Sequence, residues 1–174
     1  MPERRLKHFG WGREGDGMTR EEEDAELRRL RRRFAVERLE EIPAPRLQDV
    51  RLGAPRLAPP AALAPICSTE RYDRAVHAYG KAYPDYLRAL AGDFAAAPDV
   101  VAYPRDDAEV AAVLDWAASV QAAVTPFGGG SSVVGGLEPR IDGARHKAAV
   151  TIDLREMGRV LEVDRSSRAA RIQA

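Results

Sequence analysis

The chain has 174 residues, with 27 basic and 27 acidic side chains that leave no formal net charge. This length permits one domain with a buried core, and the balanced charge excludes a general electrostatic attraction to nucleic acid or to an anionic membrane. The single cysteine, Cys67, excludes an internal disulfide framework and favours a cytoplasmic protein. We interpret Cys67 as a small apolar residue, because no metal-ligand spacing or paired histidine supports a reactive thiol. No apolar run reaches the roughly 18 residues of a transmembrane helix, and the charged N-terminus has no signal-peptide core.

Residues 1–66 are predicted to be a flexible arm, a charged helix and a proline-rich linker that precede the main domain. Thr19 and Glu22 form a capping box at the start of the helix, and the helical spacing of apolar residues continues to Leu39. The basic run at 28–33 permits a nucleic-acid patch, but the acidic turn before it favours a solvated helix face.

Residues 67–97 are predicted to be a helical lead-in to the main domain. Ser68 suits the cap of one helix, and Pro84 suits the first turn of the next helix, in which Leu87 is expected to be buried. His77 is interpreted as a hydrogen-bonded helix residue, because no acid or nucleophile is visibly paired with it.

A β-α-β unit is predicted to follow, and it makes the fold class α+β with an α/β-like core. The first strand covers Val100–Tyr103, and Asp106 caps the crossover helix. The return strand, Ala122–Val124, is expected to run parallel to the first and to deliver the next loop at its carboxyl end, where α/β sheets place their ligands. The helix is expected to bury an apolar stripe formed by Val110, Val113, Leu114 and Ala117.

The stretch Thr125–Gly136 holds five glycines and two serines, and it is the one segment with a clear chemical purpose. Successive glycines are kept where φ is positive or where a ligand approaches the main chain closely. Bare amides in such a turn form a nest of donors for phosphate, and the hydroxyls of Ser131 and Ser132 add two more. A Walker A loop is excluded because the stretch has no lysine. A dinucleotide fingerprint is excluded because Val133 stands where the third glycine belongs.

Pro126–Ser132 resembles the pyrophosphate loop P-x-G-G-G-[ST]-S of the vanillyl-alcohol oxidase/p-cresol methylhydroxylase family, whose members share a PCMH-type FAD-binding domain. Pro98–Val110 and Val150–Asp164 resemble the blocks that precede and follow that loop in the family. Two further stretches, Lys7–Gly12 and Arg74–Gly80, are similar to segments of the alkyldihydroxyacetonephosphate synthases and their bacterial relatives within the family.

The resemblance implies a flavoenzyme in which the FAD pyrophosphate is bound by Pro126, Phe127, Gly128, Gly129, Gly130, Ser131 and Ser132. It implies an oxidoreductase, or an alkyl transferase that exchanges a fatty acyl group for a fatty alcohol, acting on a small lipid-related molecule or a hydroxy acid. Relatives that attach flavin covalently from this loop carry histidine at the position of Ser131, so the FAD is expected to be noncovalent here. We allow for a homodimer, expect no nucleic-acid partner, and assign no catalytic or metal-binding residue.

Residues 98–174 are expected to be the N-terminal part of that FAD-binding domain. Val160–Val163 and Ala169–Ala174 have the pattern of paired strands, and the chain stops inside the second strand. We therefore expect a fragment that lacks the substrate domain and is inactive by itself.

Two alternatives stay open at this point. No general acid, base or nucleophile is discernible, so a noncatalytic nucleotide- or phosphate-binding module is the main alternative to a flavoenzyme. The charged helix within 19–41 also permits an interaction protein. Bound flavin makes a protein yellow, so its visible absorbance would separate the flavoenzyme from both.

Overall fold

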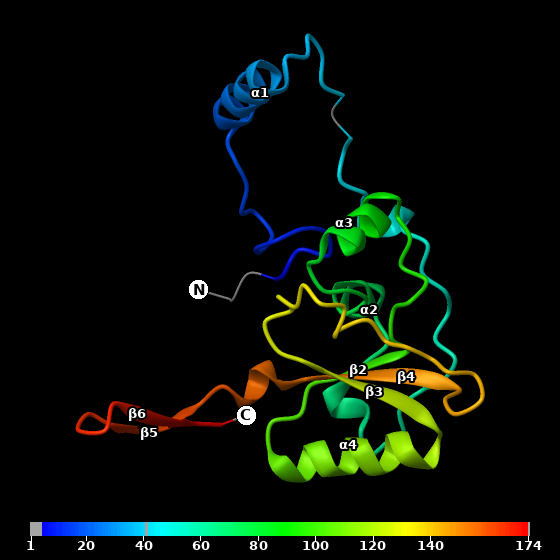
Figure 1. Ribbon diagram of the computed structural model, residues 1–174. Coiled ribbons are helices and arrows are strands. Elements are labelled where there is room, and N and C mark those ends of the chain that lie inside the picture. The colour runs from blue at the N-terminus through cyan, green and yellow to red at the C-terminus, as the bar shows by residue number, and fades with distance from the viewer. Residues whose placement is uncertain (1–4, 41, 174) are drawn as a thin grey trace.

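The computed structural model describes residues 5–40 and 42–173 of the chain. The main body of the fold contains one small mixed sheet (Figure 1). The strand order in this sheet is β1-β2-β4-β3. The strands cover Cys67–Ser68 (β1), Val100–Ala102 (β2), Ala122–Phe127 (β3) and Ala148–Asp153 (β4). Strands β2, β4 and β3 are parallel to one another, and β1 is antiparallel to β2. The predicted fold class, α+β with a β-α-β core, is confirmed.

The crossover helix between β2 and β3 is α4, Asp107–Ser119, and the side chain of Asp106 caps it as predicted. The two strands are parallel but are not neighbours, because β4 lies between them. Val113 is fully buried, as expected for the apolar stripe, whereas Leu114 is 44% exposed, so that part of the prediction is wrong. Successive residues of a helix are rotated by about 100°, so Leu114 points away from the sheet that Val113 faces.

Helices cover both faces of the sheet (Figure 1). Helix α4 lies on one face, α2 lies on the other, and α3 lies beyond α2. Helix α2 covers Arg71–Val76 and α3 covers Tyr83–Leu90. Helix α3 buries Asp85 and Ala89, which share one side, and this leaves Leu87 49% exposed instead of buried as predicted. Three short 3₁₀ helices cover Leu47–Asp49 (η1), Ala64–Ile66 (η2) and Leu154–Met157 (η3).

The proline-rich segment at 43–66 is an ordered strap along the body. Arg56 donates to the buried carboxylate of Asp99 with an Nη2 to Oδ2 distance of 2.8 Å. Farther on, Leu63 and Ile66 enter the apolar core between α4 and the sheet. Proline favours an extended backbone, so the segment can cross the surface without a helix or strand of its own.

The start of the chain also packs on the body, although the sequence predicts a flexible arm. The Tyr72 hydroxyl donates to the Leu6 carbonyl at 2.8 Å, and the Phe9 and Tyr86 rings meet edge to face at 5.6 Å between centroids. These contacts overturn the flexible-arm prediction for residues 5–16. The reason is that the few apolar side chains of the arm find a tertiary partner on α2 and α3.

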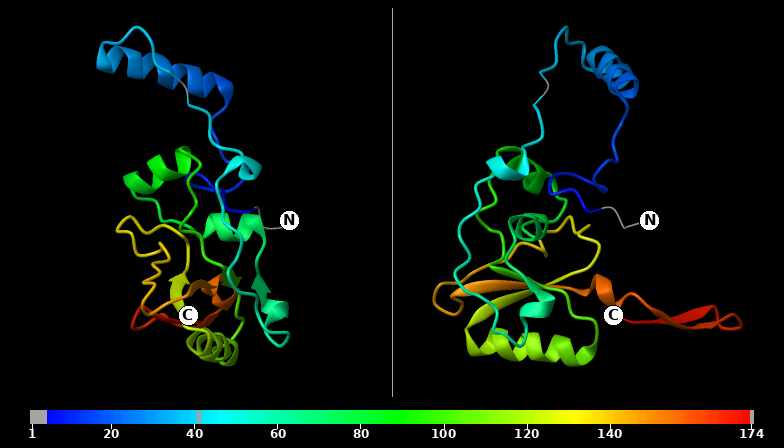
Figure 2. Two further views of the ribbon diagram at one scale, coloured as in Figure 1. Left: turned by 90° about the vertical axis from the view of Figure 1, so that its right-hand side faces the viewer. Right: turned by 180° about the vertical axis from the view of Figure 1, so that it is seen from behind.

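Helix α1, Arg20–Phe34, stands away from the body in both views of Figure 2. The predicted capping box is confirmed, with the Thr19 amide 2.7 Å from the Glu22 carboxylate and the Glu22 amide 3.3 Å from the Thr19 hydroxyl. The helix ends earlier than predicted, at Ala35, whose φ of 51° is left-handed. The helix buries none of its residues, so no tertiary packing stabilises further turns. The arginines of the run 28–33 are exposed, as expected for a solvated helix. No described helix has the length and apolar character needed to cross a bilayer.

The last two strands form a separate hairpin that projects from the body (Figure 1). Strands β5, Val160–Asp164, and β6, Ala169–Ile172, are antiparallel, which confirms the predicted pair. Every residue of both strands is exposed.

Candidate functional site

We call residues Pro126–Ser132 the glycine loop, and it leaves the sheet at the carboxyl end of the parallel strands. Pro126 and Phe127 are the last two residues of β3, and they pair with Ile152 and Asp153 at the end of β4. The β-α-β unit therefore delivers the loop at the position that the sequence predicts. This is the edge of a parallel sheet at which ligands are usually bound.

The loop backbone is open to a ligand. Gly128 and Gly129 are exposed, and a Cβ added to either would meet no atom within 4 Å. Gly130 differs, because its φ is +70° and a Cβ there would lie 2.7 Å from the Phe127 ring. Among the described residues, none accepts a hydrogen bond from the amides of residues 128–132. The loop thus has five consecutive main-chain amides without an acceptor among the described residues, of which those of Gly128, Gly129 and Ser131 belong to exposed residues.

A turn outside the loop fixes its far end. The Lys81 amide donates to the Ser132 carbonyl at 2.6 Å. A Cβ on Gly80 would lie only 2.2 Å from that same carbonyl oxygen, so the close approach requires glycine at this position. The sequence predicts Gly80 only as a helix end, and no local pattern links it to a serine so far along the chain.

Two lysines lie beside the glycine loop, although the loop itself has none. Lys7 and Lys81 line a small cavity of about 40 Å³ together with Gly129, Gly130 and Trp11, and the Trp11 side chain is exposed. Burial lowers the pKa of Lys81, and the negative charge of Asp85 opposes that shift. The fold therefore brings two lysine residues to the cavity beside the loop, and the Lys7 ammonium donates to the Asp16 carbonyl.

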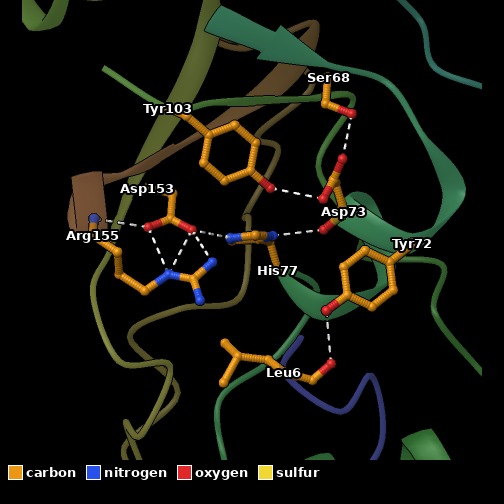
Figure 3. A network of polar contacts seen from close by, with 8 residues as sticks. All are labelled: Leu6, Ser68, Tyr72, Asp73, His77, Tyr103, Asp153 and Arg155. Atoms are coloured by element: carbon orange, nitrogen blue, oxygen red, sulfur yellow. Dashed lines mark hydrogen bonds and ion pairs between the residues drawn. The ribbon is translucent and has the colours of Figure 1, made fainter. Parts of the chain in front are cut away.

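His77 is buried behind the loop and is hydrogen-bonded through both ring nitrogens (Figure 3). Its Nε2 lies 2.9 Å from Oδ2 of Asp153, and its Nδ1 lies 2.6 Å from the carbonyl oxygen of Asp73. Both ring nitrogens therefore have a buried hydrogen-bond partner, one on the main chain and one on a carboxylate.

Asp153 is an ionised carboxylate that is hydrogen-bonded to both His77 and Arg155. Burial acts to raise the pKa of Asp153, but the hydrogen bonds from His77 and Arg155 outweigh it and the pKa is lowered. Arg155 donates from Nε to both carboxylate oxygens at 2.9 Å, and this contact raises the pKa of Arg155. We call His77, Asp153 and Arg155 the charged cluster.

The charged cluster corrects one sequence-based inference. His77 is hydrogen-bonded at the end of α2, as predicted, but the inference that no acid is paired with it is wrong. Asp153 lies 76 residues farther along the chain. The sequence held one signal for this pair, which is that Asp153 ends an apolar strand. A fully buried charge needs a partner, so an aspartate at that position indicates a cationic or hydrogen-bonding neighbour.

Cys67 packs as an apolar residue, in agreement with its interpretation from the sequence. It lies in β1 against the core between α4 and the sheet. Burial raises its pKa to about 11, so the thiol stays protonated at neutral pH and is a weak nucleophile.

Comparison with known proteins gives a family match for the part of the chain that contains the glycine loop. Residues 98–174 match the family model described as "FAD binding domain". The alkyldihydroxyacetonephosphate synthase of Dictyostelium discoideum is 30% identical over 142 residues, which cover 78% of this chain and 23% of that protein. The synthase of the same name from Trypanosoma brucei brucei is 36% identical over 101 residues, which cover 58% of this chain and 16% of that protein. The chain thus spans about a quarter or less of these relatives.

Solved structures agree with the model over nearly the whole chain. A structure of alkyldihydroxyacetonephosphate synthase in P1 superposes with a TM-score of 0.80 and 25% identity, covering 95% of this chain and 35% of that one. A second, in P2₁2₁2₁, has a TM-score of 0.77 at 24% identity and supports the fold alone. The agreement includes most of the residues before 98, which the family model does not match.

Proposed function

We propose, from the premise that the chain belongs to the FAD-binding domain family through residues 98–174, that its glycine loop holds the pyrophosphate of FAD. One observation carries the proposal: the amides of residues 128–132 donate to no described residue, and Gly128 and Gly129 have open space where a side chain would stand. A diphosphate needs such donors at close range, and a Cβ would block its approach.

The residues around the loop fit an anionic group. Ser131 is exposed and Ser132 is half-buried, so the Ser131 hydroxyl can add a donor at the mouth of the loop. Lys81 and Lys7 line the cavity next to Gly129 and Gly130, which places two basic residues near the loop. FAD itself would supply the redox chemistry, and the contribution of this chain is to bind and orient its phosphate end.

For the reaction, we propose a flavoenzyme of the alkyldihydroxyacetonephosphate synthase type, acting on a lipid-related small molecule. Support comes from the relatives and solved structures that carry that name. Oxidation of a hydroxy acid or alcohol is the second candidate, and reduction of the flavin by an added hydroxy acid without oxygen would favour it. We also propose noncovalent FAD at this loop, because the hydroxyl of Ser131 cannot replace the imidazole that attaches flavin in covalent relatives.

The test compares FAD affinity in two glycine variants. Gly129→Val places a side chain in the open space over the amides, whereas Gly143→Val is a matched control at a loop glycine where a Cβ also meets no atom within 4 Å. Losing one or two charge-assisted hydrogen bonds weakens binding by about tenfold to a thousandfold. We therefore expect Gly129→Val to lose affinity in a flavin fluorescence titration and Gly143→Val to match the wild type. Equal affinities would overturn the proposal, and flavin that stays with acid-precipitated protein would overturn noncovalent attachment.

A further inference from the structure

The Phe127 ring lies between His77 and Gly130 of the glycine loop. The His77 and Phe127 ring centroids are 4.1 Å apart, and the Arg155 guanidinium carbon lies 5.7 Å from the Phe127 ring centre. On the loop side, the Phe127 ring fills the place where a Gly130 side chain would stand, at 2.7 Å. Phe127 is 2% exposed, so the ring has little room to move. Any displacement of this ring therefore changes the surface on which Gly130 rests.

His77 is contacted from several elements. Asp153 at the end of β4 and the Asp73 carbonyl of α2 hydrogen-bond its ring, and Arg155, from the 3₁₀ turn after β4, holds the Asp153 carboxylate (Figure 3). The Tyr103 ring, after β2, meets the His77 ring edge to face at 6.0 Å, and its hydroxyl donates to the Asp73 carboxylate at 2.8 Å. The titratable groups in contact with the His77 ring are thus the Asp153 carboxylate and the Tyr103 ring, and the Arg155 guanidinium and the Asp73 carboxylate lie one contact farther away. The imidazole cannot turn without breaking a buried hydrogen bond.

We propose that His77 is a positioning residue for the glycine loop: its hydrogen bonds to Asp153 and Asp73 hold the imidazole ring against Phe127, and Phe127 holds Gly130 in its left-handed conformation. The cluster places a rigid, charged support behind five amides that have no partner of their own. Preorganised donors bind an anion more tightly than donors that must first be ordered. The effect on FAD rests on the proposed function, whereas the ordering of the loop stands without it.

The experiment measures loop order and FAD affinity in the same set of proteins. His77→Leu removes both hydrogen bonds, and His77→Gln keeps a side chain that can still donate to Asp153. Arg56→Ala is the control, because it breaks the ion pair with Asp99 at the amino ends of β2 and β4, the opposite end of these strands from the loop. Order is read from ¹⁵N relaxation of the amides of residues 128–132, and urea unfolding reports the stability of each variant.

We expect order parameters of about 0.85 for the loop amides in the wild type and below about 0.6 in His77→Leu. FAD affinity should fall by at least about tenfold in His77→Leu, by less in His77→Gln, and should stay near the wild type in Arg56→Ala. A double variant with Phe127→Leu should bind FAD no more weakly than Phe127→Leu alone, because both changes act through one ring. Additive losses, or equal losses in Arg56→Ala at matched stability, would overturn the proposal.

Two measurements keep the outcomes separate. If the wild type does not bind FAD, the proposed function fails, and the relaxation data alone decide whether His77 orders the loop. If the His77 variants do not fold, the single variant Phe127→Leu decides. Order parameters below about 0.6 for its loop amides support the proposal, and loop amides as ordered as in the wild type overturn it.

Discussion

Gly129 and Gly130 are neighbours in the glycine loop, but they are glycine for different reasons. Gly130 has a left-handed backbone and the Phe127 ring at its α-carbon, so the fold itself requires the missing side chain. Gly129 has neither constraint, so the absence of a side chain there affects only a ligand that approaches the loop from solvent. Single residues of the loop thus serve either the fold or a ligand, and substitutions can separate the two.

Gly130→Ala is expected to lower the free energy of unfolding by about 1–2 kcal/mol or more, because a side chain at that φ is strained and collides with Phe127. Gly129→Ala should change it by less than about 0.5 kcal/mol. Urea unfolding followed by tryptophan fluorescence compares the two. A similar loss in both variants would contradict the loop geometry.

Asp153 makes the free energy of unfolding depend on pH. Its pKa is below the ordinary aspartate value when folded, so its contribution is complete above the unfolded value of about 4 and is lost as the pH falls through the lower, folded pKa. Asp153→Asn leaves His77 and Arg155 without their anion and should cost about 3–5 kcal/mol at neutral pH. The gap between wild type and variant, measured by urea unfolding, should shrink below about pH 4. A gap that stays constant to pH 3 would show that Asp153 is not ionised in the folded protein.

At the scale of elements, the sequence predicts what is set by near neighbours. The capping box of α1, the cap of α4 and the hairpin β5–β6 depend on residues a few positions apart, and all three are confirmed. The insertion of β4 between β2 and β3, the docking of the first residues and the pairing of His77 with Asp153 depend on distant segments. No local period or spacing in the sequence encodes those contacts. The place of the glycine loop at the carboxyl end of the strands was therefore predictable, whereas the residues that support it were not.

Helix α1 should behave as an independent element, because it buries none of its residues. Thr19→Ala removes one side of its capping box and should destabilise the helix by about 1 kcal/mol. We expect faster amide hydrogen exchange within Arg20–Phe34 and an unchanged urea midpoint for the body. A lower midpoint would show that α1 packs on the body and contributes to its stability.

At the scale of the whole molecule, the candidate site is assembled from three parts of the chain. The matched domain supplies the glycine loop and Asp153, the α2 region supplies His77, Gly80 and Lys81, and the start of the chain supplies Lys7. The last two parts lie outside residues 98–174. The α2 region and the start of the chain therefore lie against the loop, and the loop's shape depends on the order of all three parts.

The most direct measurement is a titration of the ¹⁵N-labelled chain with FAD, followed by ¹H–¹⁵N correlation spectra, which detect weak as well as tight binding. We expect the amide signals of Gly128, Gly129 and Gly130 to shift most, and ADP, which carries the same diphosphate, to shift the same signals. Gly143, a loop glycine elsewhere on the surface, should stay in place. Shifts that leave the three loop glycines unmoved, or a response to FAD with none to ADP, would contradict the claim that the loop holds the diphosphate.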